Sequence, residues 1–283
     1  MKKPQWITLI AGIALVTILY LFGRTVPGKK LASGSPPAIS NVNISTDSIL
    51  TQAKKRLSNE QVTRLNALEH SVVRGDVKEQ QLKVYHQLAH FWLDTGQLFE
   101  PYAWFEGEAA RLENSEKSLT FAAHLFLENL RGENDPALRT WKALQAKDLF
   151  ERSLKINPDN DSSAVGLGAC YIFGGIAAMP MEGILKVRAV VEKDSTNIFA
   201  QEVLGHGSML SGQFDKAITR FETVFRLSGN NQVKLQASLM LAEAYEKKTD
   251  KDSAIHWYET SLHLITNEEI KKEVQKRIDE LKK

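Results

Sequence analysis

Leu241-Ala242-x-x-Tyr245, followed by Ala254-x-x-x-Tyr258, is the stretch that decides the fold. Related segments recur upstream: Ala146-x-x-x-Phe150, Ala164-x-x-Leu167-Gly168-x-x-Tyr171, Leu204-Gly205 and Ala217-x-x-x-Phe221. Small residues in such a pattern mark the points where two antiparallel helices approach closely, and large residues fill the space beside them. Each helix pair leaves apolar surface that the next pair covers. The pattern therefore predicts an all-α stack of helix pairs.

These motifs resemble the tetratricopeptide repeat (TPR), a helix-turn-helix unit of about 34 residues with the pattern W-x-x-L-G-x-x-Y, then A-x-x-x-F, then P. The resemblance covers roughly residues 80–266 and departs from the family by extra residues in the turn 174–180 and around 228–231. It implies a solenoid that works as a binding scaffold. It also implies that the first helix of each unit lines a concave face that receives peptides or partner helices.

We expect five segments along the chain. They are a transmembrane anchor (1–24), a flexible linker (25–45), N-terminal helices (46–80), TPR-like repeats (81–266) and a C-terminal capping helix (267–283). The linker is rich in Gly, Ser and Pro and cannot bury enough apolar area to order itself. The capping helix is expected because Ile270, Val274, Ile278 and Leu281 form one apolar stripe.

Several helix boundaries have local signals. The first two helices are expected over 46–57 and 59–74, and the next over 78–95. Ser58 and Gln61 have the spacing of a capping box, in which each side chain binds the backbone N–H of the other residue. Asp135 followed by Pro136 predicts an N-cap and a first-turn proline.

A run without charged residues extends from Trp6 to Phe22, with Lys2 and Lys3 before it and Arg24 after it. Its length, about 17 residues, is at the lower limit for a membrane-spanning helix. A cleaved signal peptide is the main alternative, but no small-x-small site stands at the expected distance. A buried core helix is a further alternative. We interpret the run as an uncleaved anchor.

Positive charge lies on both sides of this run, so the charge rule does not settle its orientation. A short N-terminal tail, one span and a long C-terminal domain form the usual layout of a signal anchor. We therefore expect a single-pass protein of a bacterial inner (cytoplasmic) membrane with residues 25–283 on the periplasmic side. The alternative is a cytoplasm-facing adaptor of the same build.

The composition excludes some classes of function. Charged residues make up 25% of the chain and the net charge is +2, whereas nucleic-acid-binding domains usually have a strongly basic face. No nucleic-acid partner is therefore expected. The single cysteine, Cys170, allows no internal disulfide and is expected to be a buried small residue.

Motifs for catalysis are lacking in the sequence. His86 and His90 are four residues apart on a predicted helix, a spacing that suits a pair of metal ligands. Two ligands do not make a site, however, and neither H-E-x-x-H nor G-x-S-x-G nor a P-loop occurs. We expect neither an enzyme nor a cofactor, and a metal-dependent enzyme using His86 and His90 remains the less favoured alternative.

The candidate partner-binding residues follow from the resemblance to TPR domains. On the matching first helices, the outward positions of the concave face are His86, His90, Glu202, His206, Gln236, Glu243 and Lys247. Their mixed charge indicates no preference for an acidic or a basic peptide. Two other candidate surfaces are the aromatic pair Tyr102 and Trp104 and the apolar loop from Ile176 to Met181.

Together these features favour a membrane-anchored TPR scaffold that binds protein or peptide partners. The layout looks like that of the anchor-plus-repeat accessory factors of translocation and of cytochrome c assembly. An accessory role in envelope protein biogenesis or complex assembly is therefore the expected function.

The expected topology is testable with reporters fused after Lys283. A reporter enzyme that is active only after export should be active there, because residues 25–283 are expected outside the cytoplasm. A reporter that works only in the cytosol, fused at the same point, is the control. Activity of the cytosolic reporter instead would favour the cytoplasm-facing adaptor.

Overall fold

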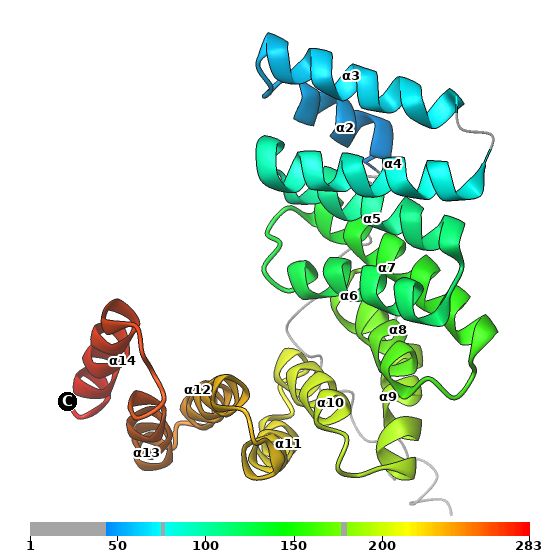
Figure 1. The fold of residues 1–283 in the computed structure, drawn as a ribbon. Helices are drawn as coiled ribbons and strands as arrows, with labels where there is room; N and C mark the ends of the chain where they lie inside the picture. The colour runs from blue at the N-terminus through cyan, green and yellow to red at the C-terminus, as the bar shows by residue number, and fades with distance from the viewer. Residues whose placement is uncertain (1–43, 75–76, 177–179) are drawn as a thin grey trace, which may run out of the picture. The chain divides into compact units, whose positions relative to one another are not determined.

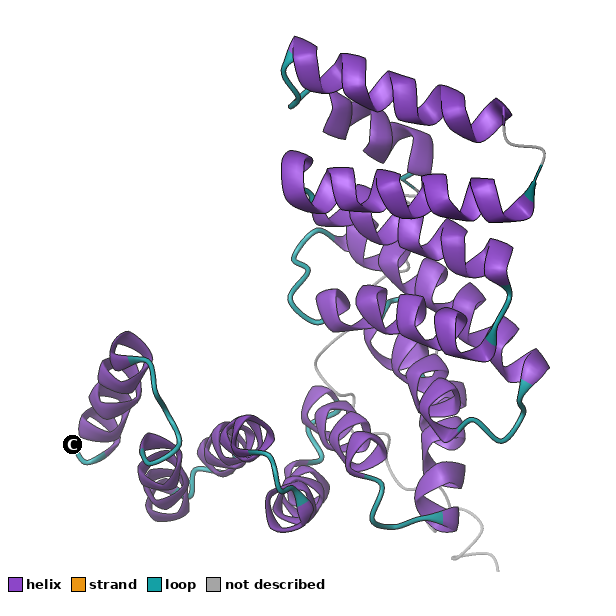
Figure 2. Ribbon diagram, viewed as in Figure 1, coloured by secondary structure: helices purple, strands orange, loops and turns teal. Residues whose placement is uncertain are grey.

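Helices and short turns make up the described part of the chain, as Figure 2 shows. The computed structural model describes residues 44–74, 77–176 and 180–283. The predicted span Trp6–Phe22 and most of the predicted linker lie outside these ranges. Within them, no helix combines the length and the apolar character that a membrane crossing needs.

The helices follow one another in chain order in Figure 1. They are α2 (Thr46–Lys54), α3 (Asn59–Arg74), α4 (Lys78–His90), the π-helical turn η1 (Phe91–Gly96), α5 (Phe99–Glu113), α6 (Glu116–Leu130), α7 (Pro136–Ile156), α8 (Asp161–Phe173), α9 (Met181–Lys193), α10 (Ile198–Leu210), α11 (Phe214–Leu227), α12 (Asn231–Lys247), α13 (Lys251–Leu262) and α14 (Glu268–Leu281).

From α4 to α13 the helices pack as consecutive pairs: α4 with α5, α6 with α7, α8 with α9, α10 with α11, and α12 with α13. Neighbouring pairs also contact one another, since α7 packs on α8 and α11 packs on α12. The first helices of three pairs lie side by side, because α8 contacts both α6 and α10. This arrangement confirms the predicted all-α stack.

The predicted helix starts are confirmed by their hydrogen bonds. The Ser58 backbone N–H donates to Gln61 Oε1 over 2.8 Å, and the Gln61 N–H donates to Ser58 Oγ over 3.3 Å. Asp135 Oδ1 accepts from the Ala137 N–H over 2.8 Å, with Pro136 in the first turn of α7. These side chains satisfy N–H groups that have no partner within the helix.

Two helix ends differ from the prediction. The first helix ends at Lys54, three residues early, and the helix predicted over 78–95 changes at Phe91 into η1. Phe91 and Trp92 are both buried although they are consecutive, so both aromatic side chains enter the core at the start of the wider turn. Gln97 then ends the segment in the left-handed conformation, with φ of 51°.

Close contact at glycines joins the helices within a pair. A Cβ atom on Gly168 of α8 would lie 2.7 Å from the carbonyl oxygen of Gly183 in α9. A Cβ atom on Gly205 of α10 would lie 2.9 Å from the ring of Phe221 in α11. The predicted small contacts at Gly168 and Gly205 are therefore confirmed.

The buried positions match the sequence pattern with one exception. Cys170 is fully buried, and burial raises the pKa of its thiol, so it behaves as the predicted small core residue. On α14, Val274 and Ile278 are buried, but Ile270 is 45% exposed. The buried stripe of this helix is thus shorter than predicted, because its first turn, which contains Ile270, is exposed.

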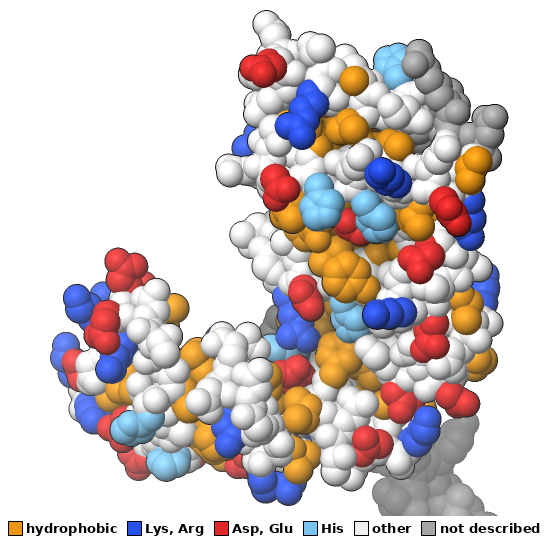
Figure 3. Space-filling view, in the orientation of Figure 1, with side chains coloured by type: hydrophobic (Ala, Val, Ile, Leu, Met, Phe, Trp, Pro, Cys, Tyr) orange, Lys and Arg blue, Asp and Glu red, His pale blue; other side chains and the backbone are white. Residues whose placement is uncertain are grey.

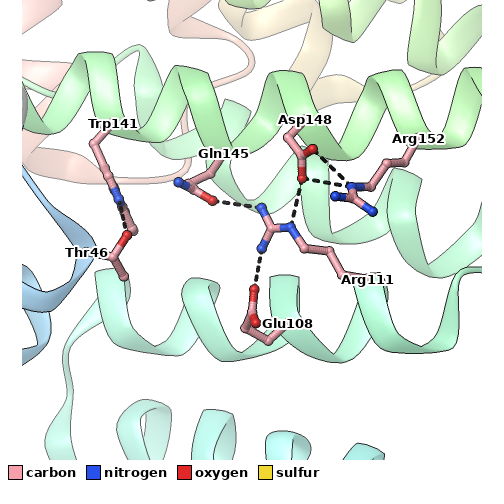
Figure 4. Close-up of polar contacts among 7 residues, drawn as sticks. All are labelled: Thr46, Glu108, Arg111, Trp141, Gln145, Asp148 and Arg152. Carbon is pink, nitrogen blue, oxygen red and sulfur yellow. Dashed lines mark hydrogen bonds and ion pairs between the residues drawn. The ribbon is translucent and has the colours of Figure 1, made fainter.

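Two positively charged side chains connect α5, α6 and α7 through ion pairs and hydrogen bonds. Lys142 is 1% exposed, and its Nζ lies 2.9 Å from Glu100, 2.5 Å from Glu133 and 2.6 Å from Asn129. Figure 4 shows the second cation, Arg111 of α5. Its guanidinium donates to Glu108, to Asp148 and to Gln145 over 2.7–2.8 Å. Buried charges of this kind require such partners.

The close contact at Gly205 predicts a large effect of a bulky side chain there. Gly205→Leu should lower the free energy of unfolding by about 1–3 kcal/mol or more, because the added atoms overlap the ring of Phe221. Thermal melting of the purified full-length chain measures this change. Lys271→Leu, at an exposed position of α14, is the control and should shift the melting temperature very little. Equal shifts for both variants would contradict the helix pairing.

Candidate functional site

The exposed side of the first helix of each pair, α4, α6, α8, α10 and α12, is the candidate site, and we call it the first-helix face. Figure 3 shows histidine, hydrophobic and charged side chains gathered over α4 and α6 on this face. Among the exposed apolar residues here is Phe121 of α6, which is 55% exposed. Aromatic side chains are enriched at protein–protein interfaces.

Two histidines occupy equivalent places on this face. The ring of His124 in α6 lies 5.2 Å from that of Phe150 in α7, and the ring of His206 in α10 lies 5.1 Å from that of Phe221 in α11. Both contacts are edge-to-face, and both phenylalanines end an Ala-x-x-x-Phe segment. The repeat therefore builds the same histidine–phenylalanine contact twice.

Each histidine also contacts an aromatic ring from another first helix. His124 lies 5.4 Å from the ring of Phe199 in α10, and His206 lies 6.3 Å from the ring of Phe173 in α8. The guanidinium of Arg131, which ends α6, lies 5.2 Å above the ring of Phe173. Side chains of α6 thus meet side chains of α8 and of α10 on the first-helix face.

Burial sets the charge state of this surface. It lowers the pKa of His206 to about 4, with a further contribution from the positive charge of Arg131. It also lowers the pKa of His124, against the opposing effect of Glu128. The carboxyl pKa of Glu202 is raised by burial, which outweighs the effect of Arg131. Both imidazoles are therefore neutral near pH 7.

Arg131 and Glu202 carry unused hydrogen-bonding capacity. Among the side-chain contacts of the described residues, neither the Arg131 guanidinium nor the Glu202 carboxylate has a hydrogen bond or an ion pair. The two groups act on each other only through their charges. Arg131 is exposed and Glu202 is half-buried, so the donors of the guanidinium and the acceptors of the carboxylate can be reached by a bound molecule.

The predicted residues of α4 have local partners. His86 Nδ1 lies 3.3 Å from Glu106 Oε2 of α5, and His90 Nδ1 lies 3.9 Å from Asp94 Oδ2. His86 and His90 have separate acidic neighbours instead of a shared one. In the ranges that the structure describes, no three His, Cys, Asp or Glu side chains gather as a metal site would require.

The remaining predicted partner-binding residues lie on α10 and α12. Glu202 and His206 are half-buried beside Arg131 and Phe173, so they point less freely outward than expected. Glu243 and Lys247 line a separate pocket of about 470 Å³ between α12, α13 and α14. Arg277 of α14 crosses this pocket to bind Glu246. Gln236 is exposed near the start of α12.

The aromatic pair on α5 packs in part against neighbouring rings. Tyr102 is half-buried with its ring 6.4 Å from that of Phe99, and Trp104 is half-buried with its ring 6.5 Å from that of Trp141. Both side chains keep part of their surface exposed, so the hypothesis that they anchor a partner stays a prediction. In the loop expected as another surface, Ile176 packs against the core, Met181 is exposed, and residues 177–179 lie outside the described ranges.

Sequence reasoning missed His124, Arg131, Phe173 and Phe199. One signal was available, because His124 and His206 both lie nine residues after the N-cap residue of their helix, Ser115 and Asn197. No comparable signal marks Arg131, since it reaches Phe173 from the end of the preceding first helix.

No family model matches this chain, and no curated protein matches it. Solved structures of similar fold include YrrB, a TPR protein described as having an unusual peptide-binding site (TM-score 0.42, 15% identity, 75% of this chain and 99% of that chain). They also include MamA AMB-1 (TM-score 0.36, 19% identity, 72% of this chain and 91% of that chain). A further one is a tetratricopeptide repeat protein from Parabacteroides merdae (TM-score 0.39, 12% identity, 82% of this chain and 97% of that chain). The identities are low, so the architecture described for this chain rests on its own helix packing.

The lowered pKa of His206 predicts acid sensitivity. Between pH 6.5 and about 4 the unfolded chain binds a proton at His206 that the folded chain does not, so stability should fall as the pH falls through this window. The loss due to this group is at most about 3 kcal/mol. Urea unfolding at pH 7 and pH 4.5 should show a smaller loss for His206→Gln than for the unchanged chain. His263→Gln, at an exposed position, is the control and should retain the full loss.

Proposed function

We propose that this chain is a scaffold that binds an extended segment of a partner protein along the first-helix face. The observation that carries this proposal is the pair Arg131, which is exposed, and Glu202, which is half-buried: their charges act on each other across α6 and α10, but neither has a hydrogen bond or an ion pair in the described part of the chain. The backbone of an extended peptide supplies both a carbonyl oxygen and an N–H group, which are the partners that these two side chains need.

Aromatic groups beside this pair supply apolar contacts for the side chains of the partner. Phe173 and Phe199 are half-buried there, and Phe121 on α6 is more exposed. Aromatic residues and arginine contribute much of the energy of protein interfaces. Neutral histidines suit such a surface, because they offer a hydrogen bond without the desolvation cost of a charge.

The α12–α14 pocket offers a second contact area of the scaffold. Two of the charged side chains that line this pocket, Glu243 and Lys247, have opposite charges. The Glu246 carboxylate, which is held by Arg277 and by the Tyr258 hydroxyl at 2.6 Å, forms its fixed wall. We propose that one partner segment of mixed charge uses these groups as well as Arg131 and Glu202.

We also propose that the scaffold is anchored in a bacterial inner membrane through residues 6–22, with residues 25–283 on the periplasmic side. The support is the uncharged run from Trp6 to Phe22 and the basic residues around it. A role in envelope protein biogenesis or complex assembly suits this layout. The alternative is a cytoplasm-facing adaptor, and the reporter fusions after Lys283 distinguish the two.

Site-specific photo-crosslinking in intact membranes tests the binding surface. A photoreactive amino acid in place of Phe121 should give a defined adduct with a partner, because this side chain is exposed on the first-helix face. The same substitution at Leu144, which is exposed on the second helix α7, should not give that adduct. The adduct should be lost when Glu202→Lys, Glu243→Lys and Lys247→Glu are combined, since several contacts of about 1 kcal/mol each are removed.

A matched variant controls for the change in net charge. Glu182→Lys, Lys186→Glu and Glu192→Lys make the same overall change on the exposed side of α9 and should leave the adduct intact. Circular dichroism should show equal helicity for both triple variants. An adduct that survives the changes on the first-helix face would place the binding surface elsewhere.

A further inference from the structure

A second pocket lies between α9, the end of α10 and the start of α11. Its volume is about 640 Å³, within the range of small-molecule sites. Its basic lining residues are Arg188, Lys216 and Arg220, and its apolar lining residues are Met181, Ile184 and Leu204. Arg188, Lys216 and Arg220 come from second helices, so the site is separate from Arg131 and Glu202 on the first-helix face.

Arg220 is held in place by a buried neutral group. Its Nη1 donates to Gln201 Oε1 over 2.7 Å, and Gln201 is only 4% exposed. The amide of Gln201 is fixed in turn, because its Nε2 donates to the carbonyl oxygen of Ser195 over 2.7 Å. A neutral partner orients the guanidinium and leaves its positive charge uncompensated.

The charges around the pocket sum to an excess of positive charge. Arg188 has only a distant ion pair, 3.9 Å to Glu192, and both side chains of that pair are more than half exposed. Lys216 donates to the neutral Gln213. The acidic lining residue, Asp215, already binds Lys248 over 2.5 Å. Burial and then the charge of Arg188 lower the pKa of Arg220, so the two cations that line the pocket act on each other.

We propose that this pocket binds a phosphate monoester, with Arg188 and Arg220 as its ligands for the phosphate oxygens. A phosphate monoester carries close to two negative charges and three strong acceptor oxygens, so it matches two guanidinium groups better than a carboxylate does. Planar guanidinium groups bind such oxygens through paired N–H donors. Met181, which is 54% exposed, and Ile184 form an apolar wall for a chain attached to the phosphate.

Isothermal titration calorimetry with the full chain in a neutral detergent tests this site. The probes are inorganic phosphate and hexyl phosphate, and hexyl sulfate serves as a probe with one charge. At least one of the two phosphate probes should bind to a single saturable site, and more tightly than hexyl sulfate. Tighter binding of hexyl phosphate than of inorganic phosphate would indicate a lipid-type phosphate as the natural ligand. Equal binding would indicate a free phosphate compound.

Variants locate the binding. Arg188→Gln and Arg220→Gln should each weaken the phosphate probe about tenfold or more, because each removes a charged hydrogen-bond donor. Arg226→Gln, on the exposed side of α11, should leave affinity unchanged. Arg188 is exposed, so its variant should keep the melting temperature and remains informative if Arg220→Gln destabilises the fold. Lack of phosphate binding, or binding that Arg188→Gln does not weaken, would overturn the proposal.

Discussion

The contact between the two helices of a pair is the constraint on which the rest of this structure depends. At Gly168 and Gly183 the backbones meet without an intervening side chain, and at Gly205 the ring of Phe221 from the partner helix occupies the space. A Cβ atom at any of these places would push the helices apart. The separation within each pair then sets where the next pair can pack.

Stacking at this separation brings the first helices side by side, and that position creates the candidate binding surface. Two groups of aromatic contacts result: His124 of α6 meets Phe199 of α10, and His206 of α10 meets Phe173 of α8 and Phe221 of α11. Each histidine stands against the phenylalanine of its own pair because the repeat places both at fixed positions. The surface is therefore a consequence of the stacking and needs no additional loop.

Charged groups have two distinct roles in this chain. Lys142 and Arg111 are nearly enclosed, and acidic and amide groups of α5, α6 and α7 surround them, so they join helices of successive pairs. Arg131 and Arg220 have no ionic partner among the described residues. Charges of the first kind hold the stack together. Those of the second kind are where we infer that ligands bind.

The sequence by itself determined the helix pairs and many of their ends. Capping by Ser58 and Asp135 and the small residues at Gly168 and Gly205 act within a helix or between sequence neighbours, so local patterns reveal them. The predicted span Trp6–Phe22 and the boundaries of the five segments stay predictions.

Only the tertiary structure decided which side chains meet across pairs. Arg131 lies over Phe173, and the charges of Arg188 and Arg220 act on one pocket, across turns whose course no local pattern specifies. The same holds for Tyr102 and Trp104, which looked free in the sequence but pack against Phe99 and Trp141. Such contacts depend on the distance and rotation between stacked helices, and these quantities exist only once the pairs have packed.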